Sequence, residues 1–219
     1  MVGSLRPVTP PLPTDPGAVP LPRRAPGPPA AAPAGPGRDP GAVRRWYENE
    51  LGWPTVPAAA GFPLRLVVGP RFDVLDVPAE AGRAALRHLA PGSPVAVQGD
   101  RMRLLLAAGA AREVPGVLAW LEWGALPLGL TAVGEGGLMD APAPPAPGRV
   151  PGPRSAARVP DALQGAAVWM RPPEPGCEAE SSLPAMPALG GGGDAPDLVR
   201  LVDTVATQCH RLRLRRSRA

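Results

Sequence analysis

The stretch that decides the fold is LRLVVGPRFDVLDVPAEAGRAALRHL, residues 64–89. Its pattern predicts a strand, a turn, a second strand and a helix, in that order. Two short runs of aliphatic and aromatic residues fit a pleated surface, and Gly69-Pro70 separates them. Pro78 has no N–H for a sheet ladder, so we expect it to end the second strand. Glu80 then falls in the first turn of the helix, where a negative charge is favourable.

Two carboxylates, Asp73 and Asp76, lie on the second strand of this stretch. Because they are three residues apart, a regular strand directs them to opposite faces. Asp76 is at the C-terminal end of the strand, where ligands gather in open sheets, and it is the candidate catalytic residue. The simplest interpretation makes Asp76 a structural residue or a remnant of a site, and the alternative makes it a metal ligand. We expect Asp73 to be a solvated strand residue.

Proline and glycine divide the chain into ordered and disordered parts. The 219 residues include 35 Pro and 27 Gly, together more than a quarter of the chain. Residues 1–39 hold almost no large apolar side chains, so we expect a disordered Pro-rich tail with P-x-x-P segments open to a protein partner. We expect a folded domain over residues 40–193, with a mobile loop near 142–160. Residues 194–219 read as an amphipathic helix with a basic end.

The folded part is predicted to be α+β, with one small mixed β-sheet and packing helices. Helices are expected near residues 39–51 and 114–121, a hairpin over 95–106, and strands over 126–133 and 166–170. We expect the five tryptophans to pack in or beside the core. In the last helix one stripe recurs with helical spacing: Leu198, Leu201, Val202, Val205, Cys209 and Leu212.

Charge and cysteine content limit the classes of function. All 23 basic residues are Arg, and the net charge is +4. A GC-rich genome explains this bias, and nucleic-acid binding is the alternative. We expect no metal site, since Cys177 and Cys209 lie far apart and the chain has only His88 and His210 besides. No signal peptide or membrane span is recognisable, so we expect a cytoplasmic protein without membrane contact.

A set of short motifs stands in a familiar order: Gly52-Trp53-Pro54-Thr55-Val56-Pro57, Val74-Leu75-Asp76-Val77, Gly99 to Leu106, and Gly136-Gly137 through Pro145. Over residues 40–190 this order resembles the N-terminal domain of bifunctional DNA primase/polymerases, the prim-pol family. The chain looks similar to small actinobacterial relatives that carry the domain without a helicase. The resemblance implies a prim-pol-like fold, a nucleotidyltransferase-like site and, in an active member, Mg²⁺ or Mn²⁺.

The chain departs from the family at the acidic positions. Active members carry two acids on the central strand, but here Asp76 takes the first place and Pro78 the second. Arg103 stands where the family has a His, and the place of a third acid holds Gly129, Leu130 and Thr131. Transfer by two metals needs several carboxylates around ions about 3.5–4 Å apart. The resemblance therefore implies a degenerate active site.

Three hypotheses follow for function. The first is a primase/polymerase-like protein that is catalytically degenerate and still binds nucleotides or nucleic acid. The second is an active DNA primase/polymerase that uses Asp76 with Asp73, Glu80 or Asp140. The third is a protein-interaction scaffold that uses the Pro-rich tail and the basic C-terminal helix.

Two groups of arginines are the candidate nucleic-acid-binding residues. Arg101 and Arg103 alternate on a strand, so both can face a groove and meet phosphate, or both can be solvated. The second group lies at the C-terminal end of the last helix and comprises Arg213, Arg215, Arg216 and Arg218. One or two of these complement the helix dipole, and the excess predicts contact with a polyanion.

Overall fold

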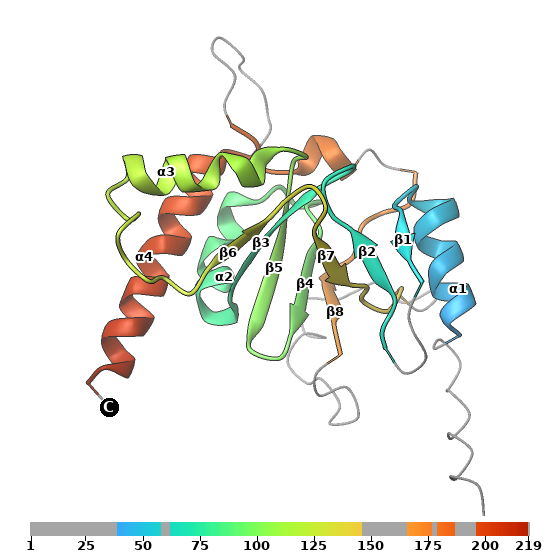
Figure 1. The fold of residues 1–219 in the computed structure, drawn as a ribbon, viewed down its shortest axis with the longest axis horizontal. Helices are drawn as coiled ribbons and strands as arrows, with labels where there is room; N and C mark the ends of the chain where they lie inside the picture. Colours follow the sequence, from blue (N-terminus) through green and yellow to red (C-terminus); the bar gives the residue numbers. More distant parts are fainter. Residues whose placement is uncertain (1–38, 58–61, 146–165, 177–178, 187–195, 219) are drawn as a thin grey trace, which may run out of the picture. The chain divides into compact units, whose positions relative to one another are not determined.

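The computed structural model describes residues 39–57, 62–145, 166–176, 179–186 and 196–218 (Figure 1). All of them belong to one compact unit, Ala34–Ala219. Helices and antiparallel strands alternate irregularly along the chain, so the predicted α+β class is confirmed. The tail predicted over residues 1–39, apart from Asp39, and most of the loop predicted near 142–160 lie outside the described residues.

The described strands form two sheets, not the single mixed sheet that the sequence predicted. The larger sheet has the order β6-β3-β5-β4-β8, and the smaller has β1-β2-β7. Every pairing between these strands is antiparallel. The bounds are Thr55–Val56 (β1), Arg65–Val67 (β2), Asp73–Pro78 (β3), Val95–Gln98 (β4), Arg101–Leu106 (β5), Thr131–Val133 (β6), Leu138–Asp140 (β7) and Val168–Arg171 (β8).

The prediction of one sheet was wrong because the two strands of the central stretch separate. β2 pairs with β1 and β7, whereas β3 pairs with β5 and β6. The chain turns between them at Gly69, whose φ of 114° favours glycine. A Cβ at Gly69 would lie 2.4 Å from the Cα of Glu135, so this turn packs tightly against the β6–β7 turn. The β2–β3 turn thus divides the central stretch between the sheets.

Helices cover one face of the larger sheet, and the smaller sheet lies with α1 on the other side (Figure 1). The bounds are Pro40–Arg45 (α1), Ala79–Ala85 (α2), Val114–Trp120 (α3) and Leu198–Arg216 (α4). α1 runs on into a π-helical turn, and short 3₁₀ turns follow α2 and precede α3. No helix among the described residues is long and apolar enough to cross a membrane.

α4 is the longest helix, and its apolar stripe packs into the core between the larger sheet and α2. All six residues of the predicted stripe are buried, from Leu198 to Leu212. The helix begins at Leu198, a few residues later than the sequence suggested. The Asp197 carboxylate caps it by accepting the N–H of Val199 at 2.8 Å. The domain core therefore holds α4 in place as far as Leu212.

A second core is aromatic and joins the two sheets. The side chain of Tyr47 is fully buried there with Trp46 and Trp53. The Tyr47 hydroxyl donates to the Pro142 carbonyl at 2.7 Å and accepts from Nε1 of Trp169 at 3.0 Å. Trp120 departs from the expectation of core packing, because 74% of its surface is exposed.

Candidate functional site

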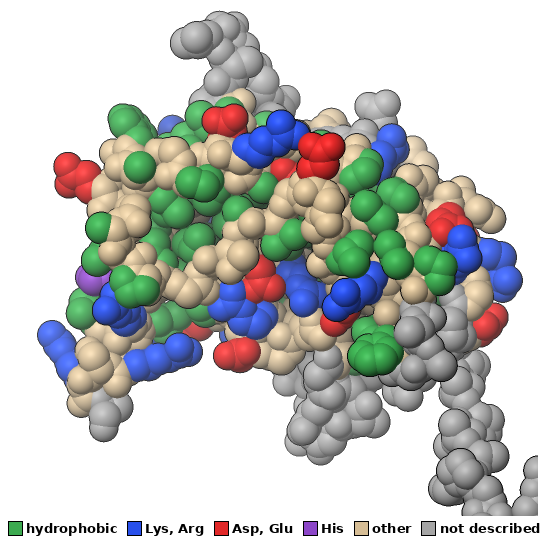
Figure 2. All heavy atoms as spheres, viewed as in Figure 1, with side chains coloured by type: hydrophobic (Ala, Val, Ile, Leu, Met, Phe, Trp, Pro, Cys, Tyr) green, Lys and Arg blue, Asp and Glu red, His purple; other side chains and the backbone are tan. Residues whose placement is uncertain are grey.

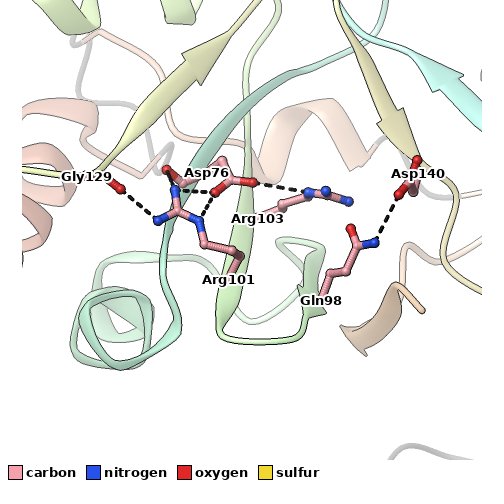
Figure 3. Close-up of polar contacts among 6 residues, drawn as sticks. All are labelled: Asp76, Gln98, Arg101, Arg103, Gly129 and Asp140. Atoms are coloured by element: carbon pink, nitrogen blue, oxygen red, sulfur yellow. Dashed lines mark hydrogen bonds and ion pairs between the residues drawn. The ribbon is translucent and has the colours of Figure 1, made fainter. Parts of the chain in front are cut away.

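The candidate site lies at one end of the larger sheet, where β3 and β5 run side by side. Asp76 on β3 stands opposite Arg103 on β5, and Pro78 stands opposite Arg101. Side chains alternate along a strand, so both arginines share the face to which Asp76 belongs. We call Asp76, Arg101 and Arg103 the Asp76 cluster (Figure 3).

Each oxygen of the Asp76 carboxylate has its own guanidinium. Arg101 binds Oδ1, and Nε of Arg103 donates to Oδ2 at 3.3 Å. Arg101 also donates from Nη2 to the Asp76 carbonyl at 3.0 Å and from Nη1 to the Gly129 carbonyl at 2.7 Å. Arg101 therefore ties β5 to β3 and to the segment that leads into β6.

Asp73, at the other end of β3, points to the opposite face. It is 1% exposed, so the expectation of a solvated residue was wrong. Its Oδ2 accepts the backbone N–H of Ala111 at 2.8 Å and so holds the 3₁₀ turn Ala110–Arg112 that precedes α3. Burial raises the pKa of Asp73, and the N–H groups of Ala111 and Gly109 oppose that shift. Asp73 serves the packing of α3 and does not approach the Asp76 cluster.

The other two acids considered for catalysis have partners of their own. Asp140, the last residue of β7, accepts from Nε2 of Gln98 at 3.0 Å and lies 3.5 Å from Nε of Arg65. This contact joins the two sheets at the end where the Asp76 cluster lies (Figure 3). Glu80, in the first turn of α2, pairs with Arg215 of α4.

The donor set does not fit the two metal ions that an active primase/polymerase-like site requires. Among the residues that the structure describes, no three His, Cys, Asp or Glu side chains come together in a way that could hold a metal ion. Two guanidiniums occupy the carboxylate of Asp76, and their charge repels a cation. The Asp76 cluster, with two guanidiniums and one carboxylate, therefore carries a net positive charge.

An ion pair joins the end of α4 to the start of α2. Arg215 pairs with Glu80, which follows Pro78 closely on the chain, and Pro78 stands opposite Arg101. Burial raises the pKa of the Cys209 thiol to about 11, and the charge of Arg101 opposes that shift.

Most of the arginines at the end of α4 are free to meet a ligand. Arg213, Arg216 and Arg218 are exposed and have no acidic partner within the described part of the chain. Basic side chains are visible where α4 ends and again in the middle of the same face (Figure 2). The surface between these two places is the candidate polyanion interface.

Sequence reasoning missed Gln98 and gave Gly129 no contact role. Gln98 lies beside the β4–β5 turn, and its amide reaches a strand of the other sheet. Gly129 contributes only a backbone carbonyl, which no side-chain pattern reveals. The predicted Gly99-Asp100 turn was the one available signal, because it places Gln98 and Arg101 opposite each other.

Comparison of the chain with protein-family models gives no match, and the same holds for curated proteins and for solved structures.

Proposed function

We propose that this protein is a primase/polymerase-like domain that has lost nucleotidyl transfer and binds nucleic acid through its arginines. The observation that carries the proposal is the capture of Asp76 by Arg101 and Arg103. A carboxylate held in this way balances protein charge and does not coordinate Mg²⁺ or Mn²⁺. The resemblance to the prim-pol family indicates nucleic acid as the class of ligand, and the arginines are the groups that would bind it.

The arrangement of charge supports contact with the phosphate backbone. Guanidinium groups bind phosphate oxygens through paired N–H donors. The free arginines at the end of α4 lie beyond Leu212, where the helix leaves the core, so they can follow a polyanion without disturbing the fold. Contacts of this kind position a nucleic acid and do not select its sequence.

Oligonucleotide titrations at two salt concentrations test the proposal. Fluorescence anisotropy with labelled single-stranded and duplex oligonucleotides gives the affinity and its salt dependence. Removal of the residues after Leu212 should weaken binding and reduce the salt slope by about one unit for each arginine–phosphate pair that it removes. Folding should be nearly unchanged, since Leu212 is the last buried residue of α4.

A matched control removes the same charge elsewhere. The double substitution Arg216→Gln with Arg218→Gln should weaken binding, whereas Arg44→Gln with Arg45→Gln should not. Arg44 and Arg45 lie on α1 and pair with Glu48 and Asp39. An equal loss of affinity in both double variants would mean that only net charge matters, and binding without salt dependence would refute the proposed contact.

An interaction scaffold is the second candidate, and one observation favours it. Trp120 on α3 is 74% exposed and Leu126 is 37% exposed, and apolar side chains gather on that part of the surface (Figure 2). Exposed tryptophan is typical of protein contacts. The apolar stripe of α4 is already used within the domain, so only the basic end of that helix is free for a partner. Sedimentation velocity of the wild type and of Trp120→Ser tests whether a second copy is the partner.

A further inference from the structure

His88 forms a contact between the end of α2 and α4. It is the last residue of the 3₁₀ turn Leu86–His88, which follows α2. Its ring nitrogen Nε2 lies 2.8 Å from Oγ1 of Thr204, a buried residue of α4. Nε of Arg87 lies 3.1 Å from the same ring nitrogen. A single nitrogen of His88 therefore has two polar partners, one from its own turn and one from α4.

The Arg87 contact determines the protonation state of the ring. The Nε–H of an arginine is always a donor, so Nε2 of His88 must accept and cannot itself carry a proton. The imidazole is therefore neutral, with its proton on Nδ1. The Thr204 hydroxyl, which can donate or accept, then donates to Nε2. Protonation of Nε2 would reverse the Thr204 hydrogen bond and would place the new N–H against the N–H of Arg87.

The surroundings of His88 also favour the neutral ring. Partial burial is the largest influence and lowers the pKa of His88, because it disfavours the charged form. Four charged groups, from its own turn and from α4, act on the ring: Arg87 and Arg200, which lower the pKa, and Asp197 and Asp203, which raise it. Both acids have other partners, since Asp197 caps α4 and Asp203 accepts from Nε1 of Trp123 at 3.3 Å.

We propose that the His88–Thr204 contact is a pH-sensitive junction, which ties the end of α2 to α4 while the ring is neutral and loosens when the ring is protonated. The folded pKa of His88 lies below its unfolded value of about 6.5. The contribution of the contact to stability is therefore complete above the unfolded pKa and is lost as the pH falls through the folded pKa. The junction does not depend on the proposed binding of nucleic acid, since it concerns how α4 is held in the domain.

An NMR titration of the wild-type protein tests the proposal. Long-range ¹H–¹⁵N spectra of the imidazole report the tautomer, and we expect the proton on Nδ1 and a pKa below about 6.5. The backbone amides of His88 and Thr204 should shift together through that pKa, because both ends of the contact change. In His88→Gln, which keeps an acceptor and does not titrate in this range, the shift of the Thr204 amide should disappear.

Urea denaturation across the same pH range measures the loss of stability. Relative to His88→Gln, the unfolding equilibrium constant of the wild type should rise by up to about tenfold per pH unit as the pH falls from about 6.5 to the folded pKa, which is the effect of one proton. Arg87→Gln should raise the pKa of His88, since it removes a donor and a positive charge. Arg83→Gln is the matched control and should change this pKa less, because Arg83 is an exposed arginine one turn earlier, in α2.

A neutral ring with its proton on Nε2, or a pKa of His88 at or above about 6.5, would overturn the proposal. So would a Thr204 amide that does not follow the ring, or equal pH profiles of stability in the wild type and His88→Gln. The wild-type titration decides the matter by itself if His88→Gln fails to fold. The Nδ1 tautomer with a lowered pKa, together with a Thr204 shift that follows it, supports the junction.

Discussion

Asp76 and Arg103 stand directly opposite each other on β3 and β5, and Nε of Arg103 lies 3.3 Å from Oδ2 of Asp76. Arg101 binds the other oxygen of the same carboxylate. A charge-assisted contact of this kind is roughly twice as strong as a neutral hydrogen bond. The carboxylate that the family resemblance places in catalysis therefore joins two strands and binds two arginines.

We expect no template-dependent nucleotide incorporation with Mg²⁺ or with Mn²⁺. The physical reason is the absence of a second and third carboxylate near Asp76 among the described residues. Primer-extension assays on single-stranded templates check this, with the wild type and Asp76→Ala run in parallel. A template-dependent product that disappears in Asp76→Ala would restore the hypothesis of an active enzyme.

Asp76→Ala should lower the free energy of unfolding by about 1–3 kcal/mol, since it removes the carboxylate that both partly buried guanidiniums bind. Asp100→Ala is the matched control. It removes an exposed carboxylate from the adjacent β4–β5 turn, and its effect should stay within about 0.5 kcal/mol. Urea denaturation of both variants measures the difference, and equal stabilities would show that the Asp76 contacts contribute nothing.

The buried carboxyl of Asp73 should make stability depend on pH. Burial raises the folded pKa of Asp73 above its unfolded value of about 3.9. The favourable contribution of Asp73 to the free energy of unfolding is therefore complete below the unfolded pKa and is lost as the pH rises through the folded pKa. Asp73→Asn keeps an acceptor oxygen for Ala111 and cannot ionise. The variant should therefore gain stability relative to the wild type as the pH rises from about 3.9 through the raised folded pKa of Asp73.

Denaturation curves for both proteins across that interval test the prediction. A difference between wild type and Asp73→Asn that is constant with pH would mean that Asp73 does not titrate abnormally in the fold.

Gly82 allows α2 to approach β5 closely. A Cβ at this position would lie 2.4 Å from Sδ of Met102 and 3.0 Å from its Cβ. Gly82→Ala should therefore destabilise the protein by about 1–3 kcal/mol through overpacking. Gly116 in α3 faces open space, so Gly116→Ala should stabilise by about 0.5–1 kcal/mol. Thermal unfolding compares the two, and a shift of the same sign in both would contradict this account of α2.

The local structure of the chain was readable from the sequence because its causes are local. The order of strands and helix within residues 64–89 follows from side-chain periodicity and from the breaks at proline and glycine. The buried stripe of α4 follows from helical spacing, and its six residues are those expected. The opposite directions of Asp73 and Asp76 follow from the alternation of side chains along a strand.

The tertiary structure alone decided which strands pair and which charges meet. β2 and β3 are adjacent in sequence but belong to different sheets, because each pairs with strands distant along the chain. Asp73 is buried because the 3₁₀ turn that contains Ala111, a segment distant in sequence, packs against it and donates an N–H to its carboxylate. Asp76 meets Arg101 and Arg103 only because β3 and β5 pair in that register. Such partners depend on the register of segments far apart in sequence, which local periodicity does not encode.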